Sequence, residues 1–374
     1  MLTSRELTSF RKDLLAWFRQ SQRDLPWRHT KDPYRIWISE IMLQQTRVAA
    51  VIPYYERFLE RFPNVRALAE APLEEVLLLW SGLGYYSRAR HLQKAAQQIV
   101  ARHGGEFPNR EEDVHALAGI GRYTAAAILS IAFGAKHAVL DGNAARVLAR
   151  VGAIRGDLRE SRRWRGLQKT AADFLDSSSP GDWNQAIMEL GAMVCTPRAP
   201  QCLLCPVAGF CRARQLGLTE SLPAKRKKNE AIEISLATAV FCDPRGHTLL
   251  LTPTGRSAAR PAVDDVATLV SRLWHFPTQP VHKDAVAELR RFLAGLLPAA
   301  GHPLKLEPLP KVRHAVTYRK ITVFPFRIVV RKIPRLRGAK NILLQDISSL
   351  PISNLTRKIG HAALLEPAAA AASS

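Results

Sequence analysis

Two acidic residues lie among apolar neighbours, where a carboxyl group is unusual. Glu40 stands within the run Trp37 to Leu43, and Asp141 follows the apolar pair Val139 and Leu140. Burial raises the pKa of an acid, and enzymes use this effect to keep a proton donor near neutral pH. The ordinary interpretation is that Glu40 faces solvent and that Asp141 only caps the helix that follows it. We therefore treat both acids as candidates for catalysis, with solvent exposure of Glu40 and helix capping by Asp141 as the alternatives.

A compact group of cysteines predicts a metal centre. Four of the five cysteines lie within 17 residues, at the spacing C-x6-C-x2-C-x5-C, and they are Cys195, Cys202, Cys205 and Cys211. In an intracellular chain, such thiolates bind a metal or a cluster and do not form disulfides. The spacing alone does not separate zinc from an iron–sulfur cluster. Because protein ligands fill all four positions, we expect a structural centre.

Two glycines mark a candidate phosphate site. The residues Leu117-Ala118-Gly119-Ile120-Gly121 predict a short helix, a three-residue turn and a second helix, which is a helix-hairpin-helix. Glycine permits positive φ and a close approach of the backbone, so amides at the start of the second helix can face a phosphate. An ordinary helical hairpin, in which Gly119 and Gly121 only close the turn, is the alternative.

A second glycine loop carries two tyrosines and two arginines between residues 81 and 90. Aromatic rings stack on bases and cations bind phosphates, so this loop is suited to entering a duplex. A plain turn with packed tyrosines is an equal alternative. The adjacent amides Gln44 and Gln45 are compatible with a similar role, although such residues are commonplace on surfaces.

Composition predicts two domains and a polyanionic partner. The 374 residues are 47% hydrophobic, and 54 Lys and Arg against 32 Asp and Glu give a formal net charge of +22. This charge favours nucleic acid and predicts binding that salt weakens. No apolar run approaches the length of a membrane span. We therefore expect a soluble cytoplasmic protein of bacterial type with no membrane association, a monomer held at the nucleoid through DNA.

Hydrophobic periodicity changes near residue 222. Before it, helical patterns cover about 7–20, 34–46, 48–62 and 72–80; beyond it, strand patterns cover 234–241, 247–251, 312–318 and 321–330, with one helix at 285–296. We expect a helical catalytic region over 1–222 with the cluster loop at 195–211, a basic linker at 223–231, an α+β domain at 232–354 and a tail at 355–374 that is disordered at its end.

These motifs, taken in order, resemble a known superfamily. The Leu-x-Gly-x-Gly turn, the stretch Leu140-Asp141-Gly142-Asn143 and the cysteine spacing are similar to those of helix-hairpin-helix DNA glycosylases. Within that superfamily, the stretches 39–46 and 84–90 closely resemble the MutY family, which removes adenine mispaired with 8-oxoguanine. The resemblance implies a six-helix barrel joined to a [4Fe–4S] cluster domain, and duplex DNA with A:8-oxoguanine or A:G mispairs as the partner.

The same resemblance implies a task for each site residue. Glu40 protonates N7 of adenine so that the base leaves neutral, and the carboxylate of Asp141 stabilises the oxocarbenium sugar. Tyr123 and Asn143 assist at the sugar and the water. The remaining residues bind the substrate: Arg28 and Gln185 line the adenine pocket, Gln45 and Tyr85 enter the duplex, and the Gly119 and Gly121 turn meets a phosphate. Adenine must be flipped out of the duplex to reach them.

Two other functions remain open. Endonuclease III-like glycosylase/lyases, which act on oxidised pyrimidines, place a lysine after Gly-x-Gly-Arg as a Schiff-base nucleophile. Tyr123 occupies that position, so we predict base removal with little strand cleavage. The other alternative is a cluster-bearing protein that binds DNA without catalysis, but such a protein needs no carboxyl group among apolar side chains beside DNA.

The second domain resembles the Nudix-like domain of the MutY family through Trp274-His275-Phe276-Pro277. A Nudix hydrolase needs a cluster of glutamates for magnesium, and residues 278–297 offer only Asp284 and Glu288. The resemblance therefore implies binding without hydrolysis. Residues 314–318 take the place of the family's His-x-Phe-Ser-His turn at 8-oxoguanine, where Thr317 keeps the hydroxyl group but the preceding aromatic residue is lost.

Overall fold

The computed structural model of the chain describes residues 2–224, 230–251, 273–297, 304–316 and 318–365. It divides into two compact units. The first, Met1–Ala71 with Arg90–Lys227, is called the helical unit here, and the second, Pro72–Ala89 with Lys228–Ser374, the sheet unit. Among the helices in the described ranges, none combines the length and apolar character that crossing a membrane requires.

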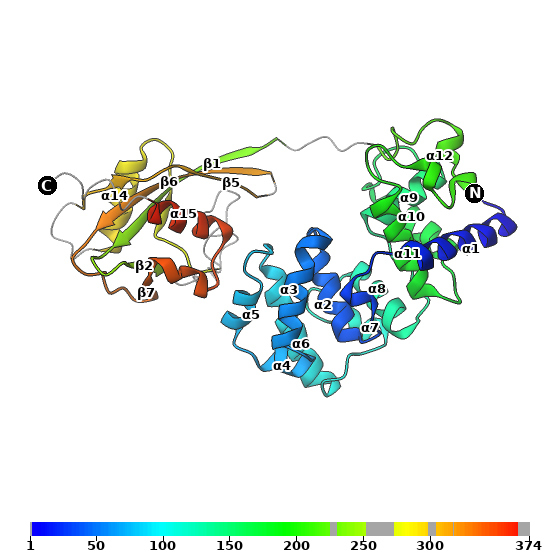
Figure 1. Cartoon of the computed structure of the whole chain (residues 1–374), viewed down its shortest axis with the longest axis horizontal. Helices are drawn as coiled ribbons and strands as arrows, with labels where there is room; N and C mark the ends of the chain where they lie inside the picture. Colours follow the sequence, from blue (N-terminus) through cyan, green and yellow to red (C-terminus); the bar gives the residue numbers. More distant parts are fainter. Residues whose placement is uncertain (1, 225–229, 252–272, 298–303, 317, 366–374) are drawn as a thin grey trace. The chain divides into compact units, whose positions relative to one another are not determined.

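The helical unit consists of helices of 4 to 18 residues joined by short turns (Figure 1). Their bounds are α1 Ser4–Ser21, α2 Pro33–Leu43, α3 Val48–Arg61, α4 Val65–Glu70, α6 Ser87–His103, which starts in the sheet unit, α7 Glu111–His115, α8 Arg122–Phe133, α9 Gly142–Val151, α10 Ser161–Phe174, α11 Pro180–Met193 and α12 Arg212–Gln215. The predicted helices near 7–20 and 48–62 are confirmed as α1 and α3. A capping box between Thr3 and Glu6 fixes the start of α1.

Helix α2 ends earlier than its pattern predicts. The apolar run leads to an expected end at Thr46, but α2 stops at Leu43, and Gln45 has φ of +57°. Left-handed backbone at a residue with a Cβ is strained, and such strain gathers at functional sites. The strained backbone in the turn after α2 therefore indicates a functional role for Gln45, which a continuous helix to Thr46 would not have indicated.

Two glycines let α11 approach its neighbours. A Cβ on Gly181 would lie 2.7 Å from the backbone oxygen of Ser130 in α8, and a Cβ on Gly191 would lie 2.7 Å from Cβ of Asn143 in α9. Real Cβ contacts are not this short, so α11 packs against α8 at its start and α9 at its end only because both residues are glycine. The middle of α11 is thereby held over the space between α8 and α9.

The predicted helix-hairpin-helix is confirmed by α7, the turn and α8. Gly119 has φ of +77°, and a Cβ there would lie 2.6 Å from Cβ of His91. Gly121 is the residue before α8, and nothing lies within 4 Å of where its Cβ would be. Packing thus explains Gly119, whereas Gly121 leaves open space beside the first amides of α8.

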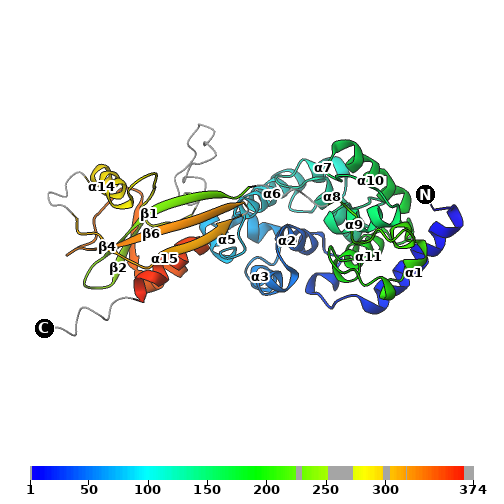
Figure 2. The same cartoon turned by 90° about the horizontal axis from the view of Figure 1, so that it is seen from above.

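The sheet unit is built on one long pair of parallel strands. The bounds are α5 Leu73–Leu79, β1 Ile232–Cys242, β2 His247–Leu251, β3 Thr278–Pro280, α14 Ala285–Leu296, β4 Glu307–Pro308, β5 Val312–Val316, β6 Arg319–Val329, β7 Ala339–Leu343 and α15 Asn354–Leu364. β1 pairs with β6 in parallel from Ile232 opposite Arg319 to Cys242 opposite Val329. The order is β3-β1-β6-β4, with β5 on β6, and β2 pairs with β7. The adjacent strands β1 and β6 run side by side in Figure 2.

Alternate residues of β1 enter two cores. Leu236 and Val240 pack in one cluster with α15, and Ala237, Ala239 and Phe241 pack in the other with α14. Successive side chains of a strand point to opposite faces, so a strand covered on both sides reads as a continuous apolar run. This confirms the α+β expectation and the predicted strands near 234–241, 247–251, 312–318 and 321–330.

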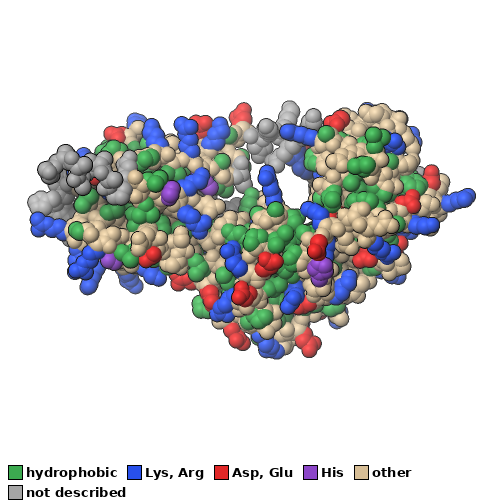
Figure 3. Space-filling view, in the orientation of Figure 1, with side chains coloured by type: hydrophobic (Ala, Val, Ile, Leu, Met, Phe, Trp, Pro, Cys, Tyr) green, Lys and Arg blue, Asp and Glu red, His purple; other side chains and the backbone are tan. Residues whose placement is uncertain are grey.

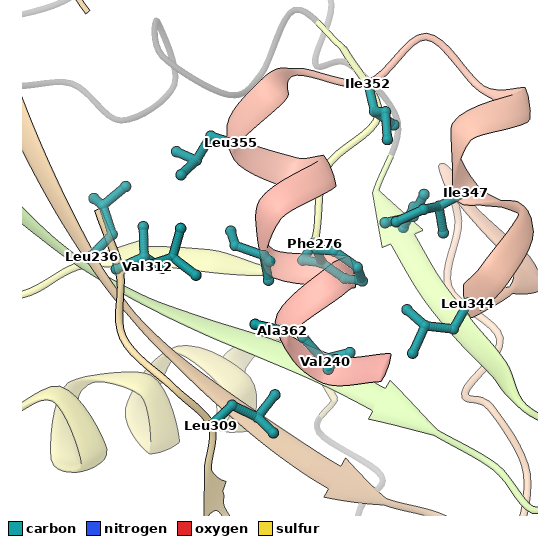
Figure 4. Packing of buried hydrophobic residues seen from close by; sticks show 14 of the residues in the cluster. Leu236, Val240, Phe276, Leu309, Val312, Leu344, Ile347, Ile352, Leu355 and Ala362 are labelled. Carbon is teal, nitrogen blue, oxygen red and sulfur yellow. The ribbon is translucent and has the colours of Figure 1, made fainter. Parts of the chain in front are cut away.

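The end of the domain differs from its predicted position. The sequence places a tail at 355–374, but residues 354–364 form α15, whose Leu355, Ile359 and Ala362 are buried in the first core (Figure 4). The Ser353 side chain accepts from Thr356 N–H and caps the helix. The residues of α15 thus carry an apolar helical stripe that the sequence interpretation missed. Residues 366–374 lie outside the described residues.

Candidate active site

A cavity of about 560 Å³ lies entirely within the helical unit. Its walls come from the turn before α2, from α2 and the turn after it, from α8, from the start of α9 and from the middle of α11. The lining includes Arg28, Glu40, Gln45, Tyr123, Asp141, Asn143, Gln185, Met188 and Glu189. Seven of these nine residues are predicted site residues, collected from positions 28 to 185.

Glu40 is buried, and among the described residues its side chain has one hydrogen-bond partner. It is 6% exposed, and the Tyr123 hydroxyl donates to its Oε2 at 2.8 Å. Burial raises its pKa to about 7, with a further rise from the charge of Asp141, although the Tyr123 hydrogen bond opposes the shift. The solvent-facing alternative for Glu40 is therefore wrong. A carboxyl group with this pKa carries a proton in a large fraction of molecules at neutral pH.

Asp141 both caps α9 and faces the cavity. Its Oδ1 accepts from Ala144 N–H at 2.7 Å, and its Oδ2 accepts from the Asn143 side chain at 2.9 Å. Burial raises its pKa, while those hydrogen bonds and the charge of Arg146 oppose the rise. The capping interpretation is thus confirmed, and it is compatible with the cavity, because the cap fixes the carboxylate against the wall.

Tyr123 stands between α2 and α11. Its hydroxyl lies 2.8 Å from Oε2 of Glu40 and 3.2 Å from Sδ of Met188. Burial raises the pKa of Tyr123 well above its usual range. The phenol therefore stays neutral and acts as a hydrogen-bond donor.

Glu189 is a cavity residue that the sequence interpretation missed. It accepts a bidentate pair from Arg28, at 3.0 and 2.9 Å, and three further hydrogen bonds from Arg23. Although burial opposes it, these hydrogen bonds lower its pKa to about 2. The signal that singled out Glu40 was also present here, since Glu189 lies between Ile187 and Leu190 on the buried face of α11.

The remaining predicted substrate-binding residues lie elsewhere. Gly119 and Gly121 are in the hairpin and do not line the cavity. Tyr85 belongs to the sheet unit, is 42% exposed and has φ of +50°, with the Arg88 guanidinium over its ring. Thr317 lies outside the described residues.

Comparison with known proteins bears on this cavity directly. Residues 38–172 match the family model of the HhH-GPD superfamily of base excision DNA repair proteins. The chain is 36% identical to the adenine DNA glycosylase of Mus musculus, over 95% of this chain and 78% of that protein, and 37% identical to that of Homo sapiens, over 95% and 74%. The chain belongs to the adenine DNA glycosylase family. It is therefore a DNA glycosylase, a hydrolase of N-glycosyl bonds, and of the three functions considered the comparisons support adenine excision.

Solved structures agree with the helical part of the fold. A thermostable thymine-DNA glycosylase is 29% identical with a TM-score of 0.52, covering 57% of this chain and 98% of its own. A non-covalent endonuclease III–DNA complex is 24% identical with a TM-score of 0.50, covering 58% of this chain and 99% of its own. At this identity, the comparison shows only that the two proteins share a fold. The helical part of this chain thus shares its fold with both of these proteins.

The family cofactor is a [4Fe–4S] cluster, and residues 195–211 match the iron–sulfur binding domain of endonuclease III. Cys195, Cys202, Cys205 and Cys211 form no disulfide in the structure and line one small cavity of about 20 Å³. In the described residues, no three His, Cys, Asp or Glu side chains converge on a point where one metal ion would sit. Thiolates spread around a shared cavity suit a cluster, because each sulfur then binds a different iron.

Proposed function

We propose that the large cavity holds an adenine flipped out of duplex DNA and that Glu40 and Asp141 together hydrolyse its N-glycosidic bond. One observation carries the proposal: the buried Glu40 and the partly buried Asp141, 101 positions apart in the chain, line one cavity, and burial raises the pKa of Glu40 to about 7. A protein that only binds DNA gains nothing from a protonatable carboxyl group in an apolar wall.

Glu40 acts as the general acid. Its Oε2 accepts from Tyr123, so the other oxygen, Oε1, is free to carry a proton toward N7 of the base. Protonation lets adenine leave as a neutral molecule, and a positioned acid of this kind contributes about 10²- to 10⁴-fold to a rate. Tyr123 is then a positioning residue, because its hydroxyl fixes which oxygen holds the proton.

Asp141 stabilises the positive charge that develops on the sugar. Two hydrogen bonds at the start of α9 hold the carboxylate in place before the reaction, so little reorganisation is needed when the charge appears. Asn143 holds Oδ2 of Asp141 and lines the cavity, so its amide lies where an attacking water would need orienting.

Arg28 and Gln185 bind the edge of the adenine. Arg28 is fixed by its bidentate pair with Glu189, and the Gln185 amide donates only a long hydrogen bond, 3.4 Å, to Gly181 O. An amide held this loosely is available for a ligand. Gln45, in strained backbone beside the cavity, and Tyr85, in its glycine loop, are proposed to enter the duplex where the base has left.

Base removal proceeds without a covalent amine intermediate. Within the described residues, no lysine lines the cavity, and the neutral Tyr123 stands where a lyase has its nucleophile. Little strand cleavage is expected. A covalent enzyme–DNA product trapped rapidly by borohydride would contradict this.

The part of the sheet unit that begins at residue 232 is proposed to be a Nudix-like domain that recognises 8-oxoguanine through Thr317, with residues 1–222 for catalysis and 223–231 as the linker. Helices on both faces of a mixed sheet support this proposal. The two acids considered as magnesium ligands support binding without hydrolysis, because Asp284 caps α14 and Glu288 accepts from the N–H groups of His282 and Lys283. Both acids are occupied by backbone. We also propose a monomer that the +22 charge holds on nucleoid DNA.

The test is single-turnover cleavage of duplexes containing A:8-oxoguanine, A:G and thymine glycol, each followed by alkali. We expect cleavage of the first two, and a loss of about 10²-fold or more in Glu40→Gln and in Asp141→Asn. Glu56→Gln, an exposed acid on α3, is the matched control and should be unaffected. Equal rates in Glu40→Gln and Glu56→Gln would remove Glu40 from the role.

A further inference from the structure

A second cavity, of about 490 Å³, lies in the sheet unit and takes no part in the proposed hydrolysis. It is formed where β1 and β6 end, by the turn between β1 and β2 and by the segment between β6 and β7. Its lining is Asp243, Pro244, Arg245, His247, Arg331, Lys332, Ile333 and Asn341. This volume is within the range of small-ligand sites.

The cavity is strongly basic. Three side chains are cations, a fourth is a histidine, and Asp243 is the single acid in the lining. The Asp243 carboxylate is already used: Oδ1 accepts from the N–H groups of Arg245 and His247, at 3.0 and 2.9 Å, and only 11% of this side chain is exposed. In the part of the chain that the structure describes, no acid pairs with Arg245, Arg331 or Lys332.

The segment that forms one wall extends this charge. From Arg331 to Lys340, five of the ten residues are Lys or Arg and none is acidic. Figure 3 shows Lys and Arg side chains gathered at the lower left of the sheet unit, beside β2 and β7. Cations gathered on one surface create a positive potential that raises the local concentration of anions.

We propose that this cavity is a phosphate-binding site. Arginine presents a planar fork of donors that matches phosphate oxygens, and the Asn341 amide adds a neutral donor. Among the described residues of the lining, Pro244 and Ile333 are the only apolar ones, whereas a protein segment usually docks through buried aromatic or apolar anchors. The chemistry therefore fits phosphate groups better than an acidic peptide.

The place of the cavity limits which phosphates can reach it. The β5–β6 hairpin turns where Val316 faces Arg319, and the cavity lies beyond Val329 at the other end of β6. Eleven residues of strand span about 33 Å, which equals roughly ten base pairs of B-form DNA. If the hairpin contacts the lesion, as the proposed function has it, the cavity receives either the flanking backbone of the same duplex or a free phosphate compound.

The experiment compares Arg331→Ala/Lys332→Ala with a matched control, Arg290→Ala/Arg291→Ala. Both pairs are exposed in the sheet unit and remove the same charge, but the control pair lies on α14 and does not line the cavity. Arg245→Ala tests the opposite wall. Each full-length protein is titrated with tripolyphosphate by calorimetry, and with lesion-centred duplexes of about 12 and 40 base pairs across a salt series.

If flanking DNA occupies the site, the slope of log K against log salt falls by about two in the cavity variant, with the long duplex only. If a free compound occupies it, tripolyphosphate binds the wild type and the control but not the cavity variant. Both results support a phosphate site and identify the source. The proposal of a phosphate site is overturned if the cavity and control variants behave identically in both titrations. It is also overturned if a hexaglutamate peptide binds the wild type and tripolyphosphate does not. Excision from the short duplex should be unchanged throughout, which separates failure here from failure of the proposed hydrolysis.

Discussion

At the scale of single residues, one helical unit holds two glutamates whose environments act on their pKa values in opposite directions. Glu40 has one hydrogen-bond donor and apolar neighbours, whereas Glu189 accepts five hydrogen bonds from two arginines. Burial dominates at Glu40 and hydrogen bonding dominates at Glu189, so the pKa is about 7 in one case and about 2 in the other. At neutral pH a large fraction of Glu40 therefore carries a proton, whereas Glu189 is ionised.

Excision should fall as pH rises through the pKa of Glu40, because the general acid must carry its proton. We expect single-turnover rates on an A:G duplex to be level below about pH 7 and to fall about tenfold per unit well above it. Glu40→Gln should show a low rate with no such fall. A wild-type profile that stays level to pH 9 would contradict the assignment of Glu40 as the acid.

Glu40 should also lower stability at alkaline pH. Its folded-state pKa is raised, so its contribution is favourable below the ordinary value of 4.5 and is lost as pH rises through about 7. Glu40→Gln keeps the acceptor for Tyr123 and removes the charge. We therefore expect it to be more stable than wild type at pH 8, by on the order of 3 kcal/mol at most, and not at pH 5. Thermal unfolding at the two pH values measures the difference.

Glu189 should behave in the opposite way. Its folded-state pKa is lowered, so its contribution is present above 4.5 and is lost as pH falls toward 2. We expect Glu189→Ala to cost about 3 to 5 kcal/mol at pH 7, because two arginines lose a buried partner. The control is Asp182→Ala, which breaks an exposed pair with Arg19 at 3.8 Å and should cost less than about 1 kcal/mol. Equal costs in urea unfolding would show that the network around Glu189 is not structural.

At the scale of elements, we expect the two glycines of the hairpin to have different roles, Gly119 in packing and Gly121 in DNA binding. Gly119→Ala meets His91 and an unfavourable φ, so we expect a loss of about 1 to 3 kcal/mol in stability. Gly121 has φ of −92°, and the position of its Cβ is open, so Gly121→Ala should leave stability unchanged. We expect this variant to bind DNA more weakly, because the added methyl group covers the amides at the start of α8. Thermal unfolding and equilibrium binding, measured on both variants, distinguish the two. A Gly121→Ala variant with normal affinity would leave the turn without a phosphate contact.

Local sequence patterns predicted the elements well where one periodicity dominated. β2 and α14 have the bounds expected from their residues. β1 begins two residues before and ends one residue after the expected 234–241, and β6 begins two residues before and ends one residue before the limits of the expected 321–330. The pattern failed where tertiary contacts decide. α2 stops at Leu43, where its apolar run ends, although a helix to Thr46 was expected, and α15 forms within the stretch that was expected to be a tail.

The site was predictable in its chemistry and only partly in its composition. Glu40 and Asp141 stood out because an acid among apolar residues is rare. Glu189 has the same local pattern, but its role depends on Arg23 and Arg28, more than 160 positions away, which no local window can show. The parallel register of β1 and β6, and the basic cavity at the end of those strands, likewise require the fold.

At the scale of the whole molecule, excision and lesion preference are expected to be separable. Every residue proposed for the chemistry lies in the helical unit, whereas Thr317 follows β5 of the sheet unit. Removing the Thr317 hydroxyl deletes a hydrogen-bonding group without touching the cavity, so Thr317→Ala should leave excision from A:G unchanged and slow excision from A:8-oxoguanine. One lost hydrogen bond of about 1 kcal/mol corresponds to a rate ratio that falls roughly fivefold. Single-turnover rates on the two duplexes give the ratio, with Thr322→Ala, on β6 of the same unit, as the control. If the ratio is the same in wild type and Thr317→Ala, discrimination must come from the helical unit, where Gln45 holds strained backbone beside the cavity and becomes the residue to test.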